Sequence, residues 1–101
     1  MELTITLEGE SGTTYESFND LGLLQAMLPD HNENNSYCLR YVDVHGDTTF
    51  NTLQMPDLID ELQQLLEKTD KEEEKNILNE VIRISIRCKD DVHLYVKFYG
   101  D

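Results

Sequence analysis

Hydrophobic and polar positions alternate at the start of the chain, where leucine or isoleucine occupies every second position of residues 3–7. A period of two residues is typical of a strand with one buried face, so a strand is predicted there. The glycines of residues 9–12 predict a turn, and a short second strand is expected at residues 13–16. Leucines at helical spacing then predict a helix that starts between residues 17 and 20 and ends before Pro29.

The middle of the chain carries strong turn chemistry. Residues 30–36 are almost entirely polar and predict a loop. Residues 37–42 alternate again and predict a strand, followed by a connection at residues 43–47. Residues 48–50 are β-favouring, so the two segments are expected to pair as a hairpin.

Two helices are predicted in the second half of the chain. Pro56 occupies a position suited to the first turn of a helix, and Asp70 with Glu73 resembles a capping box at the start of another. The polar residues 67–74 would then be the tight connection of an antiparallel helix pair. Helical spacing groups the apolar positions into two stripes, Leu58, Ile59, Leu62, Leu65 and Leu66 on the first helix and Ile77, Leu78, Val81, Ile84 and Cys88 on the second.

Residues 92–99 alternate once more and predict a closing strand. The element order predicts one α+β domain over residues 1–101. We expect a mostly antiparallel sheet of four to five strands, with the helix pair and a short helix packed on one face.

Composition adds a large negative charge to this picture. The chain has 101 residues, of which 21 are acidic and 8 basic, for a formal net charge of −13. Such a charge disfavours direct binding to nucleic acid or to an anionic membrane, because phosphate contacts require lysine or arginine. It favours a basic partner.

The charge is unevenly distributed along the sequence. Residues 1–60 contain eleven acidic residues and Arg40 as the one base, a formal charge of −10, whereas residues 61–101 carry only −3. Negative charge on the surface is explained by solubility alone when it is evenly distributed. Charge that is concentrated in one part of the chain is also suited to recognition of a basic surface.

The residue types used in catalysis and metal binding do not form recognisable patterns. Cys38 and Cys88 are far apart and outside any C-x-x-C pair, so we expect them to be buried thiols. His31, His45 and His93 lack the spacing of a zinc site, and the acidic turn around His45 lacks the ligand spacing of a calcium loop. Neither a phosphate-binding glycine loop nor a serine nucleophile motif occurs, so no enzyme activity and no cofactor are predicted.

Four tyrosines lie in predicted strands, at positions 37, 41, 95 and 99. Either they cover a sheet face and form cross-strand pairs, or they are anchors of an interface, in which tyrosine is enriched. Both interpretations stay open from the sequence.

Two segments, DVHGDTTFNTLQ at residues 43–54 and LYVKFYGD at residues 94–101, resemble a pattern found in small bacterial cytosolic proteins. In size, acidity and α+β layout the whole chain also resembles the immunity proteins of bacterial toxin–immunity systems, including those of contact-dependent growth inhibition. This resemblance implies stoichiometric inhibition of a cognate toxin, with a basic nuclease domain as the expected class. A cytoplasmic location is expected independently of this resemblance, because residues 1–8 lack the pattern of a secretory signal and the two cysteines do not suggest a disulfide framework.

The acidic face expected to bind the toxin includes aromatic anchors and one histidine, and its predicted members are Glu33, Tyr37, Tyr41, Asp43, His45, Asp47, Asp57, Asp60 and Glu61. We expect a monomer or weak dimer without direct contact to nucleic acid or membrane. Two alternatives stay open from the sequence: a nucleic-acid-mimicking inhibitor of a DNA-binding enzyme, and a non-catalytic accessory or self-associating domain.

Overall fold

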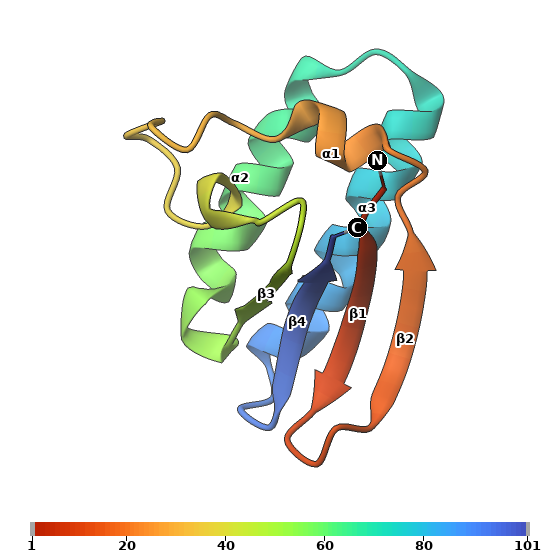
Figure 1. The fold of residues 1–101 in the computed structure, drawn as a ribbon, viewed down its shortest axis with the longest axis vertical. Coiled ribbons are helices and arrows are strands. Elements are labelled where there is room, and N and C mark those ends of the chain that lie inside the picture. The colour runs from red at the N-terminus through yellow and green to blue at the C-terminus, as the bar shows by residue number, and fades with distance from the viewer. Residues whose placement is uncertain (1, 101) are drawn as a thin grey trace.

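A four-stranded antiparallel sheet with the strand order β2-β1-β4-β3 forms one layer of the molecule (Figure 1). A computed structural model describes residues 2–100; residues 1 and 101 of the predicted domain lie outside this range. The strands are β1 (Thr4–Gly9), β2 (Thr14–Asn19), β3 (Asp47–Phe50) and β4 (Leu94–Tyr99). The predicted α+β class with a mostly antiparallel sheet is therefore confirmed.

The helices form the second layer, on one face of the sheet (Figure 1). The long helices α2 (Met55–Lys68) and α3 (Glu72–Lys89) pack against each other, and the short α1 (Leu23–Met27) packs against α3. Two 3₁₀ turns, η1 (Leu39–Tyr41) and η2 (Thr52–Gln54), flank β3 in the chain.

The core lies between the two layers. Alternate residues of β4, beginning with Leu94, are buried against the helices, and Phe98 packs edge-on against Phe50 with their ring centroids 5.7 Å apart. The alternation of β4 places the half-buried Tyr95 and Tyr99 on the opposite side of the strand, on the face of the sheet away from the helices. Alternation thus correctly predicted which face of this strand is buried.

The predicted strand at residues 37–42 is wrong. Its central residues form the 3₁₀ turn η1, and the buried residues of the segment are Cys38, Leu39 and Val42. Spacings of one and four residues place side chains on one side of a helical turn, whereas a strand would bury every second one. In a segment this short, the sequence pattern does not distinguish the two-residue period of a strand from the helical period. Here the hydrogen bonds that the backbone makes with another part of the chain favour the turn.

The predicted hairpin between residues 37–42 and 48–50 is consequently absent from the described residues. β3 pairs with β4 instead, with Asp47 opposite Tyr99 and Phe50 opposite Val96. Both long helices lie between these two strands in the chain. Local turn signals cannot reveal a pairing across such a separation.

Two helix starts also differ from the prediction. Residues 17–19 belong to β2, so α1 begins only at Leu23, and the buried Asp20 accepts the backbone N–H groups of Leu3, Gly22 and Gln25 at 2.7–2.8 Å. Asp70 does not cap α3, which begins at Glu72 after Lys71 and has no side-chain cap at its N-cap residue.

Candidate functional site

The carboxylate of Glu61 on helix α2 binds the loop that follows α1 through hydrogen bonds. Glu61 Oε1 accepts hydrogen bonds from Ser36 Oγ at 2.5 Å and Leu39 N at 3.2 Å. Its Oε2 accepts Tyr37 N and Cys38 N, both at 2.9 Å. Because three consecutive N–H groups at the start of η1 point at one carboxylate, Glu61 acts as a cap supplied by another element.

The prediction that Glu61 lies on an exposed acidic face is wrong, because the structure buries this side chain. Only 9% of its surface is exposed, and no cation among residues 2–100 lies within ion-pair distance of its carboxylate. Its negative charge acts on its surroundings: burial, together with the charges of Glu61 and Asp57, raises the pKa of the Cys38 thiol to about 12. Cys38 and Cys88 are both buried and unbridged, as expected from the sequence.

Two predicted anchor tyrosines are displayed on the segment that Glu61 fastens. Tyr37 is 65% exposed and Tyr41 is 56% exposed. The Arg40 guanidinium lies over the Tyr41 ring, 4.6 Å from its centroid, and donates to the Glu33 carbonyl oxygen at 3.3 Å. Large exposed aromatic rings held on a fixed backbone lose little conformational entropy on binding, which suits them to interface anchors.

The exposed acidic residues that were predicted for this surface come from three segments, of which the loop contributes Glu33. Asp57 and Asp60 lie on α2, on the turn before Glu61. Asp43, His45 and Asp47 lie on and beside the turn that precedes β3, where Asp43 Oδ1 accepts the backbone N–H of His45 at 2.9 Å. The loop, α2 and β3 together form one side of the molecule, which we call the loop–α2 side (Figure 1).

The ion pairs of the described residues lie away from this side. Arg83 and Arg87 of α3 pair with Glu16 of β2 at 2.6 and 3.1 Å, and Arg83 also pairs with Glu80. None of the ion pairs among residues 2–100 involves the five exposed acids that were predicted for this side, which are Glu33, Asp43, Asp47, Asp57 and Asp60. Within that range, no ion pair therefore neutralises the negative charge of this side.

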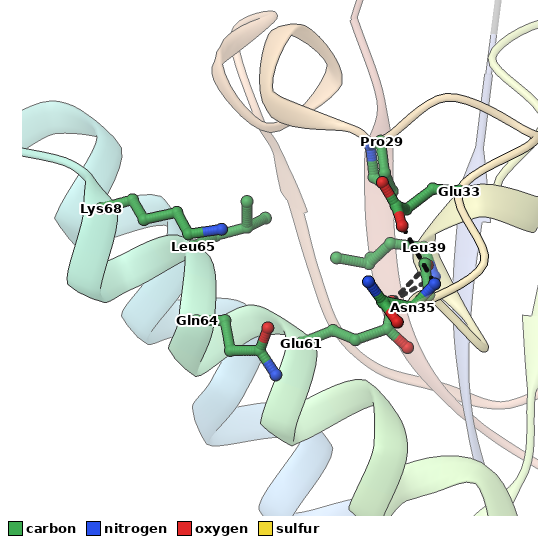
Figure 2. Close-up of a pocket in the computed structure, with 9 residues that line it drawn as sticks. Pro29, Glu33, Asn35, Leu39, Glu61, Gln64, Leu65 and Lys68 are labelled. Carbon is green, nitrogen blue, oxygen red and sulfur yellow. Dashed lines mark hydrogen bonds between the residues drawn. The ribbon is translucent and has the colours of Figure 1, made fainter.

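A cleft of about 240 Å³ separates the loop from the C-terminal half of α2 (Figure 2). Leu65, Gln64 and Lys68 line it from the helix, and the loop contributes Pro29, Glu33, Asn35, Ser36 and Leu39. The buried Glu61 also belongs to its lining. The cleft thus combines apolar walls with carboxylate and amide groups.

A second polar cluster, which sequence reasoning missed, lies on the face of the sheet away from the helices. Glu8 is buried there, accepts hydrogen bonds from Thr6 Oγ1 at 2.6 Å and from the Tyr99 hydroxyl, and pairs with Lys97 Nζ at 3.4 Å. Burial by itself would raise the pKa of Glu8, but these hydrogen bonds and the lysine charge outweigh it and lower the pKa below 4.5. The alternation of β1 places Glu8 opposite the core, but only the sheet register brings Tyr99 and Lys97 to it.

Within residues 2–100 there is no group of three or more histidine, cysteine, aspartate or glutamate residues arranged to hold a metal ion. Over the same residues, no helix has the length and apolarity required to cross a membrane. No protein-family model, curated protein or solved structure shows significant similarity to this chain. The function is therefore inferred from the sequence and the geometry.

Proposed function

We propose that the chain is an immunity protein that binds a cognate bacterial toxin in the cytoplasm and inhibits it. The loop–α2 side would cover a basic surface of the toxin, with a nuclease domain as the favoured class. The observation that carries the proposal is that exposed acidic residues share the loop–α2 side with the exposed Tyr37 and Tyr41, and that these acids take part in none of the ion pairs among residues 2–100.

Electrostatics would act mainly on the rate of encounter. A negatively charged side attracts a basic domain over distances of about 10 Å at moderate salt, and raises the association rate far more than it raises the final affinity. Tyr37 and Tyr41 would then supply packing area at the centre of the contact, where aromatic anchors contribute most. Inhibition would follow because the toxin's substrate, itself an anion, competes for the same basic surface.

The decisive experiment is purification of the chain together with the product of the adjacent gene, at low salt and again at high salt. We expect a one-to-one complex whose association slows steeply as salt is added. Absence of a complex at low salt would contradict the proposal. A complex formed only with a host DNA-binding enzyme would instead favour the nucleic-acid mimic.

Matched charge variants locate the binding side. The double substitution Asp57→Asn with Asp60→Asn removes two exposed charges from α2, and Glu72→Gln with Glu73→Gln removes two exposed charges from the start of α3. Both change the net charge by the same amount. We expect the first pair to slow association about tenfold and the second much less; equal effects would show that net charge, and not this side, guides the partner.

A further inference from the structure

The cleft between the loop and α2 is suited to a single cationic side chain. We propose that it receives one arginine side chain from the basic partner. This inference rests on the proposed function and assigns one contact of the proposed interface to the cleft. The methylene stem would lie against Leu39 and Leu65, and the guanidinium would lie at the end formed by Glu33 and Asn35 (Figure 2).

Size restricts what the cleft can hold. Its volume of about 240 Å³ is below the range of roughly 300–1,000 Å³ typical of pockets for cofactors and drug-sized ligands. It is large enough for one extended side chain and a few waters. The walls are mixed, since Leu39 and Leu65 are apolar whereas Asn35 and Gln64 carry amide oxygens, and an arginine has a matching apolar stem and polar end.

The charges of the residues that line the cleft favour a positively charged group in it. The buried carboxylate of Glu61 carries a negative charge that no cation of residues 2–100 pairs with, and Glu33 adds an exposed carboxylate at the rim. All four hydrogen bonds to Glu61 come from uncharged donors, so they satisfy its lone pairs without cancelling its charge. A phosphate or carboxylate ligand would be repelled by both acids, whereas a guanidinium is attracted.

Arginine suits this end better than lysine. A guanidinium presents five N–H donors in a plane and is more weakly hydrated than an ammonium, so it reaches a carboxylate and several amide oxygens at once with a smaller desolvation cost. Lys68 lines the same cleft from α2 and opposes any cation that enters. The charges of Glu33 and Lys68 therefore predict effects of opposite sign, which an experiment can separate.

The test uses the isolated chain labelled with ¹⁵N and two small probes, N-acetyl-arginine methylamide and N-acetyl-citrulline methylamide. The probes have nearly the same shape, and only the first is charged. We expect saturable shifts of the Tyr37, Cys38 and Leu39 amide signals with the arginine probe, because these N–H groups donate to Glu61. The dissociation constant should be on the order of 1 mM, and the citrulline probe should bind several-fold more weakly.

Three single substitutions complete the test. Glu33→Gln should weaken the arginine probe about two- to fivefold, Lys68→Gln should strengthen it by a similar factor, and Glu72→Gln on α3 should leave it unchanged. The amide spectrum of each variant shows directly that it is folded, and Glu33→Gln keeps an oxygen that can accept the Asn35 N–H.

Any of three results would overturn the arginine assignment. The two probes could bind equally well, or the arginine probe could shift the amide signals of exposed acidic residues all over the surface. The third result is an equal effect of Glu33→Gln and Glu72→Gln on binding of the arginine probe. Because the titration contains no toxin, such a result would leave the proposed function standing. Loss of the toxin complex at low salt would instead remove the proposed function while the probe titration stays valid.

Discussion

At the scale of single residues, the part of the chain that the structure describes contains three buried carboxylates that fix neighbouring segments. The exposed fractions of Glu8, Asp20 and Glu61 are 6%, 0% and 9%, and each accepts two or more hydrogen bonds. A buried carboxylate is tolerated only when donors surround it, so each of the three fixes the segment that supplies those donors. The 21 acidic residues look alike in the sequence; burial separates the structural ones from the surface charge.

Glu8 makes stability depend on pH in a specific direction. Its pKa in the folded chain lies below 4.5, so the stabilisation it provides is present above the unfolded value and is lost as pH falls through the folded value. We expect Glu8→Gln to lower the free energy of unfolding at about pH 7 and to reduce its decline between about pH 5 and pH 3. Urea unfolding across this range measures both.

An exposed acid on the helix pair serves as the control for Glu8. Glu67→Gln removes the same charge from an exposed position of α2 that takes part in none of the ion pairs among residues 2–100. It should leave the pH profile close to that of the unmodified chain. If Glu8→Gln and Glu67→Gln give the same profile, the Glu8 cluster does not carry the pH dependence.

Among the elements, sequence periodicity succeeded where the element is long. The stripe from Leu58 to Leu66 and the alternation of β4 each extend over several turns or pleats, and both elements are observed where they were expected, within one or two residues. The segment at residues 37–42 is too short for its period to be decisive. Its backbone N–H groups bond to Glu61 on a separate helix, and no local pattern records those bonds.

The turn before β3 is held against the end of β4 by a close backbone contact. Gly100 N donates to Gly46 O at 2.8 Å, and a Cβ atom on Gly100 would overlap the carbonyl group of Val44. We expect Gly100→Ala to destabilise the chain by about 1–3 kcal/mol, because neither backbone can give way without loss of this bond. Chemical unfolding measures the change.

Asn79→Ala on the exposed face of α3 is the control for this alanine substitution. It should change stability by at most about 0.5 kcal/mol, since alanine favours a helix and the position is exposed. An unaltered stability of Gly100→Ala would show that the turn docks on β4 less tightly than the structure indicates.

At the scale of the whole molecule, the ion pairs among residues 2–100 lie on parts of the chain other than the loop and α2. Cations of α3 and β4 pair with acids of β1, β2 and α3, whereas the acids of the loop–α2 side have no such partners among residues 2–100. The exposed acids predicted for the loop–α2 side therefore repel one another without an ion pair among residues 2–100 to offset that repulsion. This is the side on which the proposed function depends.

Salt should stabilise the folded chain for this reason. Screening weakens the repulsion, so moving from low salt to about 0.5 M NaCl should raise the free energy of unfolding by about 1 kcal/mol and the melting temperature by roughly 4–8 °C. Calorimetry measures the shift. The Asp57→Asn, Asp60→Asn double variant should respond less, and a melting temperature that falls with salt would contradict this account.

Local periodicity and composition were sufficient to predict the α+β class, the two long helices, the buried face of β4 and the excess of acid over positions 1–60. Three other properties emerged only in the folded chain: β3 pairs with β4, residues 37–42 form a turn on α2, and Glu61 is buried while Asp57 and Asp60 are exposed. Each of these depends on a hydrogen bond or a burial between residues distant in the chain, for which the sequence contains no local signal.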